Sequence, residues 1–427
     1  MKKRIMIIGQ CSLQWGRMEF GNIGNFYIVD PMFAQLRRVF PDAIIKTTMQ
    51  FSKEFCDKYE IETLPLEEYY DFTSEHNLEN ARQEYEEVLK GELCKSAYVE
   101  EVKQSDMIID FSGDIWGDNA DFLGKDRFET GLYKDMTAQL LKPTVMIAGS
   151  PGPFRNHEID FVKKVFSGFS LVINREPVSS FLLRQMNFDM TKVRMYPCPS
   201  FLFQGKKQNA DFILKSQNHD ESKIKIGMML CGWNFERGPF DLWPRRDDEY
   251  QRFVDLVKTV GEKFNAHFYI MSHANGFDIP PAPFELKHGR DYPIAKQFSR
   301  ILQENAIQDV TLLDGVYDPW TTKGIISQFD VLISGRMHGA VAGISQNIPT
   351  VIIDYGHEPK AHKLAGFAEV AEMENYIANP NDTNDLILKA TMCITNRAQI
   401  RKDLERKMEK IKAEAKEQFD ILNNFFA

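Results

Sequence analysis

Short, mostly apolar runs alternate with longer segments of helical spacing along most of the chain. Because short apolar runs suit strands that are buried on both faces, we expect each of them to form a strand of a parallel sheet. The expected strands are residues 5–8, 43–47, 107–111, 144–148 and 171–174 in the first half, and 224–230, 267–271, 310–313, 331–333 and 350–353 in the second. This alternation predicts an α/β fold.

The segments between these runs have the spacing of amphipathic helices. The glycine-rich residues 9–25 are expected to form a loop, and Asp30 followed by Pro31 is typical of a helix start, which predicts a helix from there to Val39. Residues 59–104 are polar and rich in Glu and Tyr, so we expect a helical excursion on the surface. The other predicted helices are 128–141, 159–166, 177–186, 249–264, 294–303, 319–329 and a tightly packed one at 339–344.

A stretch that interrupts the α/β alternation divides the chain into two predicted domains. Residues 197–223 contain prolines and a polar run, and we interpret them as a linker. They separate an N-terminal α/β domain, 1–196, from a C-terminal α/β domain, 224–395. The charged tail, 396–427, predicts a C-terminal amphipathic helix packed on the body, because apolar residues recur in it at helical spacing: Ile400, Leu404, Met408 and Ile411.

Composition limits the classes of protein and the compartment. Of 427 residues, 43% are hydrophobic and 26% charged, which is typical of a globular protein. The net charge of −9 argues against a general nucleic-acid binder, which needs a basic surface. Six cysteines without a CxxC pair fit a reducing cytoplasm and predict neither disulfides nor a zinc site. No run reaches the roughly 18 apolar residues of a membrane helix, so we expect no transmembrane segment.

The most informative stretch begins at the end of the expected strand 331–333. Ser334 and Gly335 permit a sharp turn, and Arg336 and His338 follow it, two residues apart. The carboxyl end of a strand before a helix is where open α/β sheets bind ligands and where backbone N–H groups favour anions. A buried guanidinium needs a planar acid as its partner. An internal salt bridge and a core histidine remain the alternative reading.

Glycines at the ends of other expected strands point to the same edge of a sheet. Gly9, Gly113 and Gly149 each stand at or just beyond a strand end, where a turn lets backbone N–H groups approach a ligand. No GxGxxG follows a strand and no GxxxxGK[ST] occurs, which argues against a dinucleotide cofactor and excludes a P-loop.

Five blocks, in order along the chain, resemble the polysaccharide pyruvyltransferase family. The turn and helix at 334–344, with Pro349, Asp354, Tyr355 and Lys360 beyond them, resemble its C-terminal signature; the earlier blocks are 21–25, 110–114, 148–154 and 174–179. Asn25 stands where the family usually has Asp, and the turn at Gly113 and Asp114 keeps only part of the family's glycine run.

This resemblance implies a GT-B-like fold, in which two Rossmann-like domains face each other across a cleft and the C-terminal one carries the donor site. It also implies transfer of pyruvate from phosphoenolpyruvate to two hydroxyls of one sugar, which forms a cyclic ketal, with no cofactor and no metal. The implied catalytic residues are His338, Arg336 and His273. The implied substrate-binding residues are Arg175, Lys360, Gly24, Asn25, Gly113, Asp114, Gly149, Ser150 and Gly339.

Other readings stay open. The same fold would suit a GT-B glycosyltransferase that uses a nucleotide sugar, and Asn25 would suit a non-catalytic sugar-binding relative. The resemblance places the acceptor in a cell-surface polysaccharide, such as an exopolysaccharide, or in its lipid-linked precursor. We therefore expect a cytoplasmic enzyme, with peripheral contact at the inner face of the membrane as the open alternative.

Overall fold

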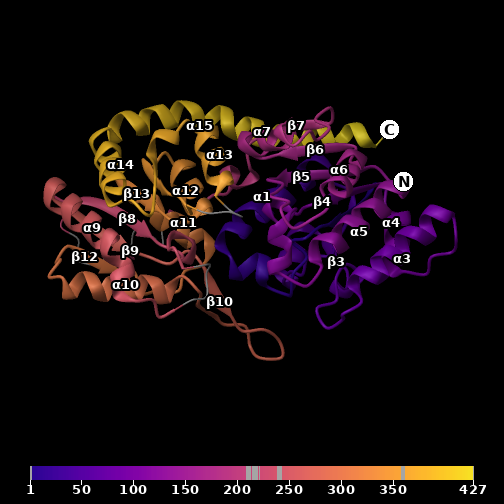
Figure 1. The fold of residues 1–427 in the computed structure, drawn as a ribbon, viewed down its shortest axis with the longest axis horizontal. Helices are drawn as coiled ribbons and strands as arrows, with labels where there is room; N and C mark the ends of the chain where they lie inside the picture. Colours follow the sequence, from indigo (N-terminus) through magenta and orange to yellow (C-terminus); the bar gives the residue numbers. More distant parts are fainter. Residues whose placement is uncertain are drawn as a thin grey trace. The chain divides into compact units, whose positions relative to one another are not determined.

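The computed structural model describes residues 2–207, 213, 220, 222–237, 243–356 and 361–426, which form two compact units (Figure 1). Unit 1 comprises Met1–Met18, Pro31–Pro199 and Glu414–Ala427, and unit 2 comprises Glu19–Asp30 and Ser200–Ala413. Thus residues 19–30 belong to unit 2 and the end of the chain to unit 1, although the sequence suggested one continuous N-terminal domain and a separate tail. Residues 208–212, 214–219 and 221 of the predicted linker lie outside the described residues.

Unit 1 is built on a seven-stranded parallel sheet with the order β3-β2-β1-β4-β5-β6-β7. Strand order reverses between β1 and β4, where Ile8 pairs with Asp110. In such sheets the crevice beyond the carboxyl ends at this switch point is the usual ligand site. The strands are β1 (Arg4–Ile8), β2 (Ile44–Thr47), β3 (Ile61–Thr63), β4 (Met107–Asp110), β5 (Thr144–Gly149), β6 (Leu171–Asn174) and β7 (Val193–Met195).

The helices associated with this sheet are α1 (Ile23–Val39), α2 (Lys53–Tyr59), α3 (Asn77–Lys90), α4 (Ala97–Gln104), α5 (Arg127–Leu141), α6 (Ile159–Gly168) and α7 (Pro177–Gln185). The prediction that the first helix begins at Asp30 is wrong, because α1 starts at Ile23 and contains Pro31. The Asn22 side chain accepts a hydrogen bond from the Gly24 N–H at 3.1 Å and so supplies the cap.

Unit 2 repeats the arrangement with a six-stranded parallel sheet of order β12-β9-β8-β13-β14-β15, whose switch point lies between β8 and β13. Its strands are β8 (Ile224–Met229), β9 (Ala266–Ile270), β12 (Val310–Leu312), β13 (Val331–Ser334), β14 (Thr350–Ile353) and β15 (Ile377–Ala378). An antiparallel hairpin of β10 (Asn275–Phe277) and β11 (Leu286–His288) stands apart from this sheet.

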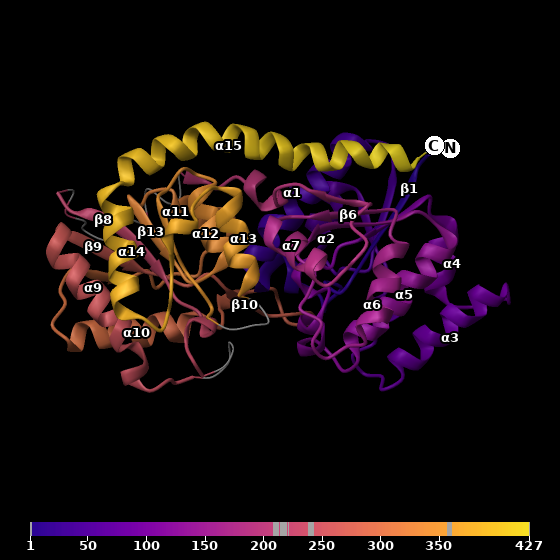
Figure 2. The ribbon, with the colours of Figure 1, turned by 45° about the horizontal axis from the view of Figure 1, so that its top comes forward.

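The remaining helices are α9 (Gln251–Phe264), α10 (Tyr292–Glu304), α11 (Pro319–Ile326), α12 (Met337–Ile344), α13 (His362–Val370), α14 (Thr383–Thr395) and α15 (Arg397–Asp420). The expected C-terminal helix is confirmed, and Figure 2 shows α15 as one long helix. Its residues Leu404 and Met408 are buried, whereas Lys407 pairs with Glu372 at 2.6 Å. Among the described residues, no helix is long and apolar enough to cross a membrane.

The predicted fold class is confirmed, and so are the ten expected strands, with ends shifted by at most one residue. The sequence pattern missed β3, β7, β15 and the hairpin, because each of these strands has only two or three residues. The polar excursion at 59–104 contains α3 and α4 as expected, but also β3. The predicted loop 9–25 contains a π-helical turn, Arg17–Gly21, and the start of α1.

Candidate functional site

The turn after β13 stands at the switch point of unit 2 and presents Arg336. The Ser334 hydroxyl donates to the Arg336 carbonyl at 2.8 Å and accepts from the Arg336 N–H at 3.2 Å. Gly335 is required here, because any Cβ would collide with the amide of Asn234. Gly339 is required as well, since its Cβ would lie 2.5 Å from the Met229 sulfur. The glycines thus let the strand end and α12 close tightly around Arg336.

Arg336 is held by an acid of the protein itself. Its Nε donates to Asp291 Oδ2 at 2.8 Å, and its Nη2 donates to Asp291 Oδ1. The two residues therefore form a bidentate salt bridge along one edge of the guanidinium. Both side chains are buried. Burial alone would lower the pKa of Arg336, but the facing Asp291 carboxylate raises it overall, and Arg336 remains a cation. The sequence left two possible partners for Arg336, a bound anion and an acid of the protein. The structure shows an acid of the protein, Asp291, bound to two of the three guanidinium nitrogens.

His338 lies in the first turn of α12, against the start of α1. A Cβ placed on Gly24 would lie 2.7 Å from both Cβ and Nδ1 of His338, so the two residues are in close contact. On another side, the imidazole meets the ring of Phe367 edge-on, with 5.8 Å between centroids. Asn25 is half-buried, and its side-chain oxygen accepts from the Asn22 amide at 3.4 Å. Unit 2 therefore brings together Gly24, Asn25 and His338, which are far apart in the sequence.

His273 follows β9 and is fully buried. Burial, with the nearby Arg336 cation as a second cause, lowers the pKa of His273 to about 3. Its ring meets that of Tyr27 edge-on at 5.5 Å, and its Nε2 finds no hydrogen-bond partner among the described residues. Burial therefore favours the neutral form of this imidazole at physiological pH.

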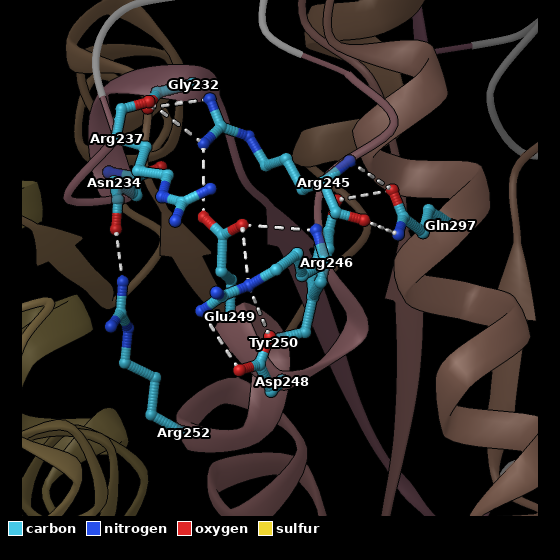
Figure 3. Close-up of polar contacts among 10 residues, drawn as sticks. All are labelled: Gly232, Asn234, Arg237, Arg245, Arg246, Asp248, Glu249, Tyr250, Arg252 and Gln297. Carbon is cyan, nitrogen blue, oxygen red and sulfur yellow. Dashed lines mark hydrogen bonds and ion pairs between the residues drawn. The ribbon is translucent and has the colours of Figure 1, made fainter.

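Two arginines fix the turn after β8 (Figure 3), which contacts the Arg336 turn through Cys231. Cys231 Sγ donates to the Gly335 carbonyl at 3.0 Å, which links the two turns. Arg245 reaches the Gly232 carbonyl at 3.4 Å and Arg252 reaches the Asn234 carbonyl at 3.1 Å. Figure 3 shows both guanidinium groups directed back at this turn. These arginines hold the backbone next to Arg336 in place.

Unit 1 has a corresponding polar turn at the carboxyl ends of its central strands. Gly113 has φ +61°, a conformation that favours glycine, and its carbonyl accepts from the Ser150 N–H at 2.9 Å. Arg175, which is buried, donates through Nε to Ser150 Oγ at 2.8 Å and approaches Asp114 at 3.4 Å. The Gly149 carbonyl accepts from the Arg175 N–H at 2.8 Å.

Beneath this turn lies a pair of buried acids. Ser112 Oγ donates to Asp110 Oδ2 at 2.8 Å, and Trp116 Nε1 donates to Asp135 Oδ2 at 3.1 Å. Oδ1 of Asp110 and Oδ1 of Asp135 are both buried and have no hydrogen-bond partner among the described residues. Burial raises the pKa of both carboxyl groups, and the mutual repulsion of the two charges raises that of Asp135 further.

The structure thus groups the predicted residues within each unit. In unit 2, it gathers Gly24, Asn25, His273, Arg336, His338 and Gly339; in unit 1, it gathers Gly113, Asp114, Gly149, Ser150 and Arg175. Lys360 lies outside the described residues.

The sequence reasoning missed Asp291, Tyr27 and the acid pair. Asp291 precedes a helix that starts with Tyr292-Pro293, which reads as an ordinary N-cap, and its pairing with Arg336 is visible only in three dimensions. Among the described residues, no group of three or more His, Cys, Asp or Glu side chains could hold a metal ion.

Solved structures of similar fold match nearly the whole chain. A glycosyltransferase from Rickettsia africae matches with a TM-score of 0.58 and 12% identity over 99% of this chain and 97% of its own. HepE of Anabaena, in complex with UDP and glucose, matches with a TM-score of 0.58 and 10% identity over 98% of both chains. A UDP-GlcNAc 2-epimerase from Neisseria meningitidis matches with a TM-score of 0.54 and 11% identity over 99% of both. At such low sequence identity, these matches show a shared fold and nothing about activity.

The fold and its two polar turns define the class as a GT-B-like α/β protein with two Rossmann-like sheets. No curated protein matches the sequence. The family model described as Polysaccharide pyruvyl transferase matches residues 22–357. The chain therefore belongs to the polysaccharide pyruvyl transferase family, and the resemblance noted in the sequence is confirmed.

Proposed function

We propose that the protein transfers pyruvate from phosphoenolpyruvate to two hydroxyls of one sugar in a cell-surface polysaccharide or its lipid-linked precursor. The observation that carries this proposal is the turn after β13, where a buried guanidinium fixed by Asp291 stands two residues before His338. This arrangement supplies a positive charge and a titratable group at one strand end, and family membership supplies the class of reaction.

In this proposal, cations hold the carboxylate and phosphate of the donor. Arg336 would contact an anion through Nη1, because Asp291 occupies the Nε–Nη2 edge. Fixing a guanidinium in advance lowers the reorganisation needed when charge develops in the transition state. Arg175 and Lys360 stay predictions from the family resemblance.

His338 is the proposed proton-transfer residue. Protonation of the donor's CH₂ carbon makes the adjacent carbon electrophilic, and a sugar hydroxyl attacks that carbon as it loses its proton. Phosphate then leaves with its bridging oxygen, and the second hydroxyl attacks the same carbon to close the ketal. Two hydroxyls and phosphoenolpyruvate thereby give the ketal and inorganic phosphate. His273, neutral because of its burial, is suited to packing or to accepting a hydrogen bond, and Asn25 cannot act as a base.

A thermal-shift comparison of phosphoenolpyruvate with UDP-glucose tests the class of donor. A ligand that binds only the folded protein adds about 2.7 kcal/mol at 100 times its dissociation constant. We expect phosphoenolpyruvate to raise the melting temperature, and incubation with an acceptor glycan to release phosphate. Stabilisation by UDP-glucose alone would favour the glycosyltransferase alternative, since the chain shares its fold with a protein crystallised with UDP and glucose. Binding of phosphoenolpyruvate without phosphate release would favour a non-catalytic relative.

A further inference from the structure

The tip of the β10–β11 hairpin is an uninterrupted apolar segment exposed to solvent. It consists of residues 279–284, Ile-Pro-Pro-Ala-Pro-Phe, and all six are exposed. Figure 1 shows the loop that joins β10 to β11 projecting beyond the helices and strands of unit 2. Ile279 is 55% exposed, and Phe284, although it contacts the Phe20 ring at 4.4 Å, is 49% exposed. A contiguous apolar patch of this kind marks an interaction surface.

The backbone of the tip is unusual because it offers few hydrogen-bond donors. Three of its six residues are prolines, which have no N–H. The N–H of a fourth, Ala282, is used within the tip, where it donates to the Ile279 carbonyl at 3.2 Å. Below the tip, the Asp278 N–H donates to the Glu285 carbonyl at 3.0 Å. A protein partner that adds a strand to the hairpin would need free backbone N–H groups for its hydrogen bonds. In a hydrocarbon environment, by contrast, each free N–H costs free energy. The small number of donors in this tip therefore favours contact with lipid over pairing with the edge strand of another protein.

The charges that flank the tip are largely compensated. Lys287 pairs with Asp278 at 2.7 Å and lies 3.9 Å from Glu285. The tip itself carries no charge, and the chain has a net charge of −9. Attraction to anionic lipids therefore cannot drive association. Binding of the tip to a membrane would therefore be driven by the burial of its apolar side chains alone.

The hairpin is also connected directly to the candidate site. Its first strand begins two residues after His273, and its second strand ends three residues before Asp291, which holds Arg336. Anything bound at the tip is thus linked through two short strands to the Arg336 turn.

We propose that residues 279–284 form a docking tip that inserts into the interfacial region of a lipid bilayer. The inference does not depend on the proposed reaction. If that reaction holds, docking would bring the Arg336 turn to an acceptor held at the membrane by a lipid carrier.

Flotation with phosphatidylcholine vesicles tests the proposal with the full chain. We expect the protein to float with these vesicles, with binding that is insensitive to salt, and to bind less at low salt when a quarter of the lipid is phosphatidylglycerol. The variant I279S/F284S should lose roughly tenfold or more in partitioning, because two large apolar side chains no longer enter the interface. The matched control is L388S/F181S, since Leu388 is 53% and Phe181 55% exposed elsewhere on the surface.

Three flotation results would overturn the proposal: no flotation of the parent protein, equal loss in tip and control variants, or flotation that requires the anionic lipid. The mass of each variant in solution should be measured alongside. A fall in oligomeric state for I279S/F284S would mean that a second copy covers the tip. Circular dichroism shows whether the variants fold, and phosphate release without vesicles separates a failure of docking from a failure of the proposed reaction.

Discussion

Asp291 forms a bidentate salt bridge with Arg336 through both carboxylate oxygens. Asp291 precedes α10, whereas Arg336 precedes α12. Asp291 occupies the N-cap position of α10 but makes no side-chain cap; its carboxylate turns to the guanidinium instead. This leaves one nitrogen, Nη1, for a ligand. Such an arrangement fixes a cation in a buried turn without leaving it uncompensated, since an unpaired buried charge is costly.

Arg336→Lys should damage activity although it keeps the charge. Lysine has a single nitrogen, which cannot hold Asp291 at two points and still contact an anion. We expect a loss of about 2–4 kcal/mol in transition-state stabilisation, measured as phosphate release from phosphoenolpyruvate. Arg300→Lys is the control, because Arg300 also pairs with carboxylates, Asp247 and Glu304, but is 47% exposed and should change little. Turnover within twofold of the parent would show that Arg336 does not bind the donor.

His338→Gln should lower turnover by about 10²–10⁴-fold, the usual contribution of a positioned acid or base. Binding of phosphoenolpyruvate should change less, because a proton-transfer group acts mainly in the transition state. Single-turnover phosphate release and equilibrium donor binding separate these two effects. His76→Gln, at an exposed position of unit 1, is the control. An equal loss of binding and rate in His338→Gln would assign His338 to binding.

Gly24→Ala tests the contact between α1 and His338. The new Cβ would lie 2.7 Å from His338 Cβ and Nδ1, so that the imidazole or the start of α1 must move. We expect a loss of about 1–3 kcal/mol in stability, the usual cost of overpacking, together with reduced turnover. Gly261→Ala is the matched control: it also lies in a helix, its Cβ would meet nothing closer than 3.8 Å, and it should stabilise α9 by about 0.5–1 kcal/mol. Full activity in Gly24→Ala would remove α1 from the site.

The sequence predicted the β-strand ends and the Arg336 turn well, because buried parallel strands have a strong apolar signal and the turn needs glycine. The predicted start of α1 at Asp30 is wrong for two reasons. Asp30 followed by Pro31 has the sequence of a helix start, although Pro31 lies inside α1, and the actual N-cap residue, Asn22, lies in a glycine-rich stretch that suggested a loop. The partner of Arg336 could not be found this way. Asp291 is 45 residues distant, and nothing local distinguishes it from other helix-capping acids.

His273→Gln should make the protein more resistant to acid. Burial lowers the pKa of His273 to about 3 in the folded state, whereas in the unfolded chain it is about 6.5. Below pH 6.5 the unfolded state therefore takes up a proton that the folded state does not, and stability falls by about 1.4 kcal/mol per pH unit until the folded pKa is reached. Urea unfolding at pH 7 and pH 5 measures this slope. We expect a shallower decline in the variant, and identical slopes would contradict the buried, neutral state of His273.

The acid pair beneath the unit 1 turn predicts a pH dependence of the opposite sign. Asp110 and Asp135 have raised pKa values in the folded state, so the folded protein keeps a proton that the unfolded chain loses above about pH 4. The stability associated with that proton is fully present below the unfolded pKa and declines as the pH rises toward the folded value. Asp135→Asn keeps an acceptor for the Trp116 N–H without a titrating proton, and we expect its free energy of unfolding to fall less between pH 5 and pH 8 than that of the parent. Asp106→Asn is the control, since Asp106 is exposed at the surface, where it accepts from the Arg4 N–H at 2.8 Å. A parallel decline in Asp135→Asn and the parent would contradict the raised pKa of Asp135 in the folded state.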